Sequence, residues 1–363
     1  MLSEVGSNFW ISPDELKINS SSEINLVQFG CVGNDCAFFS TGRSAISYVL
    51  DTIESRNPNV KKVALLPPFT CHTVIEPFLA KGYEVRTFHV GQNLRSSATD
   101  LLNVIETCQV GVILFHRYFG FDTIKNIGAI IPVLRSEGVI VIEDCTQCLY
   151  SRFSKSDADY SVGSIRKWCG VPDGGFAVCR DGNFNNKPTQ VDKKLQEAKK
   201  EASILKYEYL FNGKGDKSVF LTQYREAEDI LAAQKQYFTI SDLSKLIQVN
   251  LDVEFLKAKR KANYEIVARG LIGCNGVKVL FDTINEDVVP LYCPILCKDR
   301  QAVQKELVKN NIYAPVVWPK ADCCPQVDED ADYLYEHILC IPIDQRYDID
   351  DMERVVGVIK NIE

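Results

Sequence analysis

The chain has 363 residues, of which 46% are hydrophobic and 25% charged, so its composition is that of a globular protein with a large core. Its formal net charge of -7 excludes nucleic acid or an anionic membrane as the main partner, because both require a basic surface. A chain of this length is expected to form two domains, or one domain with a lobe.

The N-terminal residues contain no basic region followed by an apolar run, and no later stretch has the length needed to span a bilayer. We therefore expect a cytoplasmic protein without a membrane partner. The fourteen cysteines are spread along the chain, which favours buried free thiols. Cys145 and Cys148 have the spacing of a redox dithiol or half a zinc site, but the four histidines are scattered, so we expect no metal site.

Short apolar runs alternate with helical patterns between about residues 40 and 180. The apolar runs have the length of buried strands and cover residues 63–66, 84–90, 110–115, 138–143, 160–165 and 176–179. Apolar residues at helical spacing cover 43–54, 73–80, 100–107 and 124–136. This alternation predicts an α/β fold with a mostly parallel sheet.

The pattern changes after Cys179 and becomes mainly helical. We expect helices at 191–205, 221–236, 240–248 and 252–270. A second, smaller lobe with alternating strands and helices follows at 288–297, 299–310, 313–318, 338–343 and 349–362. We place the domain boundary after residue 240, so that 1–240 form an N-terminal arm and the large domain and 241–363 the small C-terminal domain.

Ligands of a parallel sheet bind at the carboxyl ends of its strands, so polar residues that follow the apolar runs are candidates for a site. Residues 41–44, with the sequence Thr-Gly-Arg-Ser, open a predicted helix. The free N–H groups of Gly42 and Arg43 can bind a phosphate there, and the Arg43 side chain can add positive charge. An ordinary helix cap is the alternative interpretation.

Two carboxylates, Glu143 and Asp144, end the segment 138–144. A charge in this place is costly unless it is paired, which makes Asp144 a candidate partner for a cationic ring. Gln147 lies three residues further and can face the same pocket. A strand-end aspartate that caps a loop is the alternative.

Lys167 follows the next apolar run and precedes two glycines, Gly174 and Gly175. A Schiff-base lysine needs a phosphate anchor, shielding from water and backbone room for a flat cofactor, which Ser164, Lys167 and the glycines can supply in order. The spacing from Asp144 to Lys167 fits two successive strand ends that open on one crevice. A solvated surface lysine is the alternative.

These motifs, in this order, resemble the fold-type-I pyridoxal 5'-phosphate (PLP) enzymes, and within them the DegT/DnrJ/StrS sugar aminotransferase family. The resemblance covers nearly the whole chain, which looks like a divergent member. It rests on blocks at 40–45 (STGRSA), 66–72 (LPPFTCH), 116–120 (HRYFG), 143–147 (EDCTQ), 164–167 (SIRK), 173–175 (DGG) and 339–343 (LCIPI). It implies a large domain similar to that of aspartate aminotransferase and a smaller C-terminal α/β domain.

The resemblance also implies a role for each matching residue. Lys167 forms the Schiff base with PLP and later moves a proton, and Asp144 keeps the pyridine nitrogen protonated. The remaining matches surround the cofactor: Gln147 near its ring oxygen or phosphate, Ser164 with the Gly42 and Arg43 amides at the phosphate, and His72 as the residue that stacks on the ring.

Three features depart from the family pattern. In the loop that covers the cofactor ring, Cys71 or His72 stands where the family has an aromatic residue, and His72 is the first candidate for stacking. Ser164 lies three residues before Lys167, where the family commonly has five, and no clear counterpart of the family's Gly-x-Asn-x-Arg segment is present. Trp318, Tyr118 and Arg117 are candidates either for substrate contacts or for the core.

The activity implied by the resemblance is a PLP-dependent, ping-pong amino transfer within a homodimer. An amino acid, with glutamate as the first candidate, donates its amino group to a keto group, for which a nucleotide-linked sugar is one candidate acceptor. The alternatives are a PLP enzyme of another reaction type, such as a dehydratase, and a non-catalytic binding protein that retains the fold.

Overall fold

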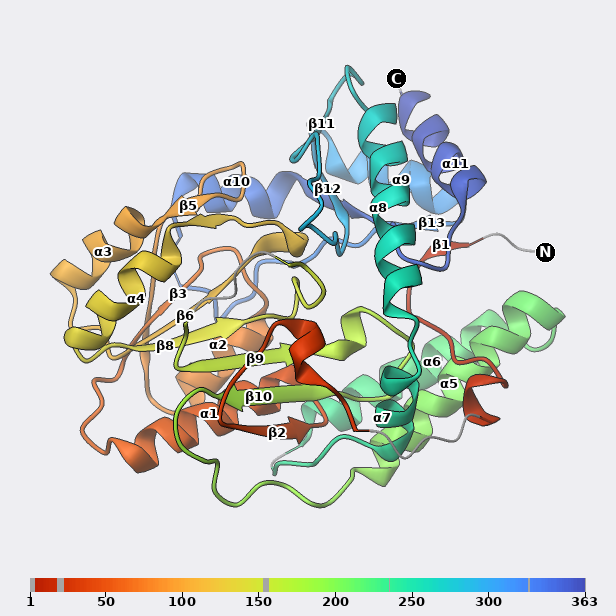
Figure 1. Cartoon of the computed structure of the whole chain (residues 1–363). Coiled ribbons are helices and arrows are strands. Elements are labelled where there is room, and N and C mark those ends of the chain that lie inside the picture. Colours follow the sequence, from red (N-terminus) through yellow and green to blue (C-terminus); the bar gives the residue numbers. More distant parts are fainter. Residues whose placement is uncertain (1–3, 18–22, 153–156, 235, 326, 363) are drawn as a thin grey trace.

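The structure, a computed structural model, describes residues 4–17, 23–152, 157–234, 236–325 and 327–362. Its centre is a seven-stranded sheet with the strand order β2-β10-β9-β8-β6-β3-β4 (Figure 1). The strands are β2 (Asp35–Phe39), β3 (Val63–Leu66), β4 (Glu84–Thr87), β6 (Val112–His116), β8 (Ile140–Asp144), β9 (Tyr160–Ser164) and β10 (Gly175–Cys179).

The sheet is mostly parallel, as predicted. The neighbouring pairs from β4 to β9 are parallel, whereas β10 runs antiparallel to both β9 and β2. Every residue of β6 and β10 is buried, because helices and loops cover both faces of the sheet. β2 was not predicted, since Asp35 and Cys36 interrupt its apolar pattern at the edge of the sheet.

Four helices of this part cover the sheet: α1 (Gly42–Arg56), α2 (His72–Ala80), α3 (Ala98–Thr107) and α4 (Ile127–Ser136). Alternate strand residues enter different clusters, since Val112 packs with α1 and α2 whereas Ile113 packs with α3 and α4. The helix predicted from residue 124 starts later, because Ile124–Lys125 form strand β7, which pairs with β5 (Ser96–Ser97).

The smaller lobe lies above the large sheet in Figure 1. It contains an antiparallel sheet with the order β11-β12-β14, formed by β11 (Val277–Val279), β12 (Cys293–Cys297) and β14 (Ile338–Ile341). Its helices are α8 (Val253–Gly270), α9 (Arg300–Lys309), α10 (Glu329–His337) and α11 (Ile349–Lys360). α9 and α11 match predicted helices, whereas α10 and β11 were not predicted.

Two long helices, α5 (Lys193–Asn212) and α6 (Lys217–Ala232), form a hairpin at the lower right of Figure 1. Its buried apolar residues form two small clusters that are separate from the large cores of the molecule: Leu195, Ala227 and Leu231, and Ala202, Phe220 and Tyr224. The helix predicted at 191–205 corresponds to α5, which extends further, to Asn212. We refer to α5 and α6 together as the hairpin.

The N-terminal strand β1 (Val5–Gly6) pairs in parallel with β13 (Ile312–Tyr313) of the smaller lobe. Ser241, which caps α7 (Asp242–Val249), binds Asp173 of the large sheet part. The domain boundary after residue 240 stays a prediction. None of the described helices combines the length and the apolar character needed to cross a membrane.

Candidate active site

Lys167 ends a single 3-10 turn, η4 (Ile165–Lys167), that directly follows β9. The chain then passes Asp173, whose buried carboxylate accepts hydrogen bonds from the Ser241 hydroxyl at 2.7 Å and the Ser244 hydroxyl at 2.5 Å. Buried polar groups need such partners, so these bonds fix the end of the lysine loop to α7.

Trp168 anchors the other end of the loop. Its ring is fully buried, and its Nε1–H donates to the Thr146 carbonyl at 2.7 Å. Thr146 lies in the turn that carries Asp144 and Gln147. The bond therefore joins the loops that follow the neighbouring strands β8 and β9, and it holds Lys167 near both residues.

A cavity of about 690 Å³ opens at the carboxyl edge of the parallel sheet. It is lined by all seven residues that the sequence predicts for a cofactor site: Gly42, Arg43, His72, Asp144, Gln147, Ser164 and Lys167. They lie at the starts of α1 and α2 and at the carboxyl ends of β8 and β9. The structure therefore brings four separate segments together.

Lys167 is accessible to solvent and lines this cavity as well as a smaller one, of about 360 Å³, beside Arg260. Burial lowers the pKa of Lys167, and the adjacent Arg166 cation lowers this pKa further. Cys71 and Glu228 act in the opposite direction. A lower pKa increases the fraction of neutral amine, which is the nucleophilic form of a lysine.

Asp144 ends β8 and is buried, with 7% of its surface exposed. Its Oδ1 accepts the Thr146 N–H at 2.9 Å, and across the described residues no cationic side chain forms an ion pair with it. Burial raises the pKa of Asp144, although the Thr146 hydrogen bonds counteract this rise. A buried carboxylate that lines a cavity without a protein cation fits a ligand that brings a positive charge, such as a protonated ring nitrogen.

The start of α1 forms another wall of the cavity. The Thr41 hydroxyl accepts the Ser44 N–H at 3.0 Å, while the first-turn N–H groups of Gly42 and Arg43 have no partner within the helix. A Cβ atom on Gly42 would lie 3.3 Å from the Ser164 Cβ, so glycine lets α1 approach the end of β9 closely. This helix start fits a phosphate.

The Arg43 side chain takes a different direction from the one expected. Its Nη1 pairs with Glu76 at 3.0 Å, and its Nη2 donates to the Leu231 carbonyl at 3.0 Å. The guanidinium thus joins α1 to α2 and to the hairpin, and its charge is already balanced. The geometry therefore favours the backbone N–H of Arg43, rather than its side chain, as a phosphate donor.

Gln147 belongs to a buried network. Its Oε1 accepts the Phe119 N–H at 3.0 Å, and its Nε2 lies 3.3 Å from His116 Nδ1, while His116 Nε2 lies 3.2 Å from the Thr70 hydroxyl. An amide that donates to Nδ1 places the imidazole proton on Nε2. Burial lowers the pKa of His116 to about 3, so its ring is neutral. Sequence reasoning assigned no role to His116, although this residue begins the 116–120 block that carries the family resemblance.

His72 and Trp318 line the cavity from opposite parts of the sequence. His72 is half-exposed, and its Nε2 lies 3.9 Å from Glu76 Oε1. Trp318 packs edge-on against His116 with ring centroids 5.6 Å apart, so the smaller lobe contributes an aromatic wall. Arg117 instead forms a buried ion pair with Glu143. His72 as the stacking residue stays a prediction.

Cys145 and Cys148 are buried in the core and do not line the cavity. The Sγ atoms of Cys145 and Cys31 lie 3.7 Å apart, and none of the fourteen cysteines, all within the described ranges, forms a disulfide. In the described ranges, no group of three or more His, Cys, Asp or Glu side chains is arranged to hold a metal ion.

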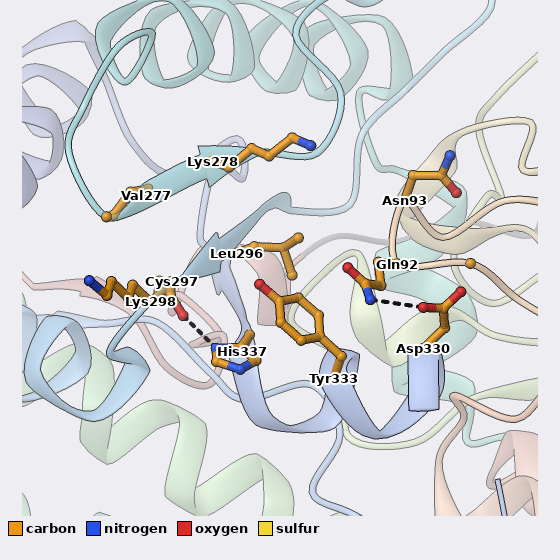
Figure 2. Close-up of a pocket in the computed structure, with 12 residues that line it drawn as sticks. Gln92, Asn93, Val277, Lys278, Leu296, Cys297, Lys298, Asp330, Tyr333 and His337 are labelled. Carbon is orange, nitrogen blue, oxygen red and sulfur yellow. Dashed lines mark hydrogen bonds between the residues drawn. The ribbon is translucent and has the colours of Figure 1, made fainter. Parts of the chain in front are cut away.

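A second cavity, of about 680 Å³, lies between the loop after β4 and the smaller lobe (Figure 2). Gln92 donates to Asp330 at 2.8 Å, and His337 Nδ1 donates to a backbone carbonyl at 2.8 Å. The ammonium groups of Lys278 and Lys298 point away from each other (Figure 2). The polar groups that line this second cavity do not converge on one point, so the cavity beside Lys167 is the candidate site.

The sequence matches no protein-family model and no curated protein. Solved structures do match. PseC of Helicobacter pylori, an aminotransferase involved in the biosynthesis of pseudoaminic acid, has a TM-score of 0.70 and 13% identity, over 98% of both chains. The sugar aminotransferase CalS13 of Micromonospora echinospora has a TM-score of 0.67 and 18% identity, over 99% of both chains.

A third match is a DegT/DnrJ/EryC1/StrS aminotransferase from Brucella abortus, with a TM-score of 0.64 and 15% identity over 97% of this chain and 91% of that chain. The chain has the DegT/DnrJ/EryC1/StrS aminotransferase fold. This fold confirms the predicted architecture, a large domain with a mostly parallel sheet followed by a smaller C-terminal α/β part. Because these aminotransferases match over almost their whole length, the likeness includes the hairpin and the smaller lobe.

Proposed function

We propose that this chain is a divergent member of the DegT/DnrJ/StrS family and a PLP-dependent aminotransferase. The observation that carries this proposal is the convergence of Lys167, Asp144 and the start of α1 on one cavity. These groups match three different parts of PLP. A lysine, a carboxylate or a helix start alone would have an ordinary structural explanation, whereas their convergence favours a single ligand.

Each part of the cofactor would be held by a different segment. The Gly42 and Arg43 N–H groups and the Ser164 hydroxyl would bind the phosphate, Asp144 would bind the ring nitrogen, and Lys167 would bind the aldehyde carbon. Ser164 donates to the Gly174 carbonyl at 3.2 Å, so its oxygen can still accept a hydrogen bond. When bound, PLP supplies an electron sink for negative charge on the neighbouring carbon.

The protein residues would control the proton and the orientation of the ring. Lys167, with its lowered pKa, would take a proton from the substrate carbon and return it during amino transfer. Asp144 would remain ionised beside a protonated ring nitrogen, since that cation offsets the cost of burying the carboxylate. Neutral His116, held by Gln147, would keep Thr70 and the loop before α2 in place.

We infer a small-molecule amino donor and a keto acceptor, with alternate binding of the two. Glutamate is the first donor to test, and a keto group on a nucleotide-linked sugar is the first acceptor. This choice of acceptor is supported by neighbours that are described as sugar aminotransferases. We expect the protein to act as a homodimer in the cytoplasm.

The experiment is a half-reaction in the absence of an acceptor. The purified chain, loaded with PLP, is mixed with glutamate, and both the absorbance of the cofactor and the release of 2-oxoglutarate are measured. We expect conversion of the cofactor to its amine form with one oxoglutarate per site. If no amino donor of a panel yields an oxo acid, the result would count against amino transfer. If the chain binds PLP but releases no oxo acid, another PLP reaction such as dehydration would be favoured.

A further inference from the structure

The hairpin brings charged residues to the candidate site from outside the parallel sheet. Glu228 and Asp229 of α6 both line the cavity that contains Lys167. The Glu228 carboxylate accepts hydrogen bonds from Arg166 Nη2 at 3.0 Å and from Lys199 Nζ of α5. A single carboxylate therefore binds the residue before Lys167 and a second cation from the hairpin.

The cluster formed by Lys167, Arg166, Lys199 and Glu228 contains more basic groups than carboxylates. Lys167, Arg166 and Lys199 supply three basic groups, and Glu228 is the carboxylate that binds two of them. Burial raises the pKa of Glu228, but Arg166 and Lys199 overcome this effect and lower the value to about 2, so Glu228 is ionised at any working pH. Burial and Arg166 lower the pKa of Lys199 to about 8.

The other elements packed around Lys167 also carry charged or titratable groups. On the side of the smaller lobe, Lys167 lines a cavity of about 360 Å³ together with Arg260 and the ion pair of Asp344 and Arg346. Cys71 precedes α2, Arg43 lies in the first turn of α1 and is paired with Glu76, and Asp144 ends β8 on the ring-nitrogen side. Burial and Arg166 weaken Lys167 as a base, whereas Glu228 strengthens it. A base works best when its proton affinity is matched to the working pH, so a lysine beside unbalanced cations would take a proton from carbon poorly.

We propose that Glu228 is a positioning residue that neutralises Arg166 and Lys199, so that Lys167 can both hold and release a proton during the reaction. This inference deepens the proposed function and rests on it. It assigns to the hairpin a direct part in the site, through charge rather than through contact with the substrate.

The test measures the ionisation of Lys167 in the full chain without cofactor. Trace acetylation by acetic anhydride is followed from about pH 6 to about pH 11, a range that spans lysine ionisation, and the peptide that contains Lys167 is quantified by mass spectrometry. Glu228→Gln keeps the shape of the side chain and removes its charge. We expect its midpoint to move to lower pH, and labelling at neutral pH should rise about tenfold for every pH unit that the midpoint moves.

Three further variants make the expected pattern specific. Arg166→Gln should move the midpoint in the opposite direction, to higher pH, and the double variant should return toward the wild-type midpoint. Glu226→Gln is the matched control, because Glu226 lies on the same helix two residues before Glu228 and is exposed, but does not line the cavity. Its midpoint should remain that of the wild-type chain.

A midpoint that stays unchanged or rises in Glu228→Gln, in a variant whose thermal unfolding matches that of Glu226→Gln, would overturn the proposal. With PLP and glutamate added, the same displacement should appear in the pH profile of kcat while KM changes little. If the chain fails to bind PLP, the proposed function is refuted. The acetylation midpoints would still decide the charge effect of Glu228, so the two failures are distinguishable.

Discussion

The carboxyl edge of the parallel sheet and the α5–α6 hairpin contribute to the same cavity in different ways. The sheet edge supplies Asp144, Ser164 and Lys167 from two adjacent parallel strands and the turn after them. The hairpin supplies Glu228 and the Leu231 carbonyl from helices with small cores of their own. In the proposed function, the edge carries the groups for chemistry, and the hairpin carries the carboxylate that balances their charge.

This difference follows from how each region is held. The edge is fixed by strand pairing and by buried hydrogen bonds such as those of Asp173, whose loss would leave unsatisfied groups. The hairpin is attached near the cavity by polar contacts that remain partly accessible to water. Substitutions at the edge should therefore abolish chemistry or folding, whereas substitutions in the hairpin should mainly change the pH dependence of the reaction.

The largest effect is expected at Lys167. Lys167→Ala removes both the covalent attachment and the proton carrier, so amino transfer should fall by about 10³-fold or more. The half-reaction with glutamate measures this loss. Lys245→Ala, which removes a lysine that pairs with Asp242 on the surface, is the control and should retain full activity. Comparable activity in both variants would exclude Lys167 from the chemistry.

Asp144→Asn should have the next largest effect. The substitution keeps the shape of the side chain but removes the charge that would bind the ring nitrogen, and a charged hydrogen bond contributes about 1.5–3 kcal/mol. PLP affinity should therefore fall about ten- to hundredfold in an absorbance titration. Glu226→Gln, which removes an exposed carboxylate of the hairpin outside the cavity lining, serves as the control and should keep the wild-type affinity. Equal affinity in the two variants would contradict the role of Asp144.

Gly175→Ala should break the close contact between β10 and the start of α1. A Cβ atom there would lie 2.2 Å from the Thr41 carbonyl oxygen, so the backbone would have to shift. We expect a loss of about 1–3 kcal/mol in the free energy of unfolding, measured with urea. Gly128→Ala is the matched control, because its Cβ meets no atom within 4 Å and the change favours a helix. A loss at Gly128 equal to that at Gly175 would argue against the close contact.

His116 should make the stability depend on pH. Its pKa of about 3 lies below the value near 6.5 in an unfolded chain, so the unfolded state binds more protons between these values. Stability due to this group is present above pH 6.5 and is lost as the pH falls toward 3, by at most about 1.4 kcal/mol per pH unit. His116→Asn should therefore show a smaller loss of stability in urea unfolding across this range. An unchanged slope would mean that His116 is not buried as a neutral ring.

The sheet edge could be predicted because its signals are local. The apolar run at 63–66 coincides with β3, and the strand end, the lysine and the glycine turn lie within one short segment around Lys167. A chain that ends parallel strands with polar residues places those residues on one edge. For this reason all seven predicted residues line one cavity.

The remaining parts depend on packing between distant segments. Glu228 lies in a helix rich in charged residues, and nothing in its sequence shows that it meets Arg166. His116 begins the 116–120 block of the resemblance, but it was not assigned to the site, because its role depends on contacts with Gln147 and Thr70 from other segments. The direction of the Arg43 side chain depends in the same way on Glu76 and on the Leu231 carbonyl.

The central claim, that Lys167 is the residue that binds PLP covalently, can be tested by borohydride reduction. The full chain is incubated with PLP, reduced, digested and examined by mass spectrometry. We predict one phosphopyridoxyl group per chain, on the peptide that contains Lys167. A label on Lys199, the nearby lysine with a pKa of about 8, or the absence of any label, would contradict the account.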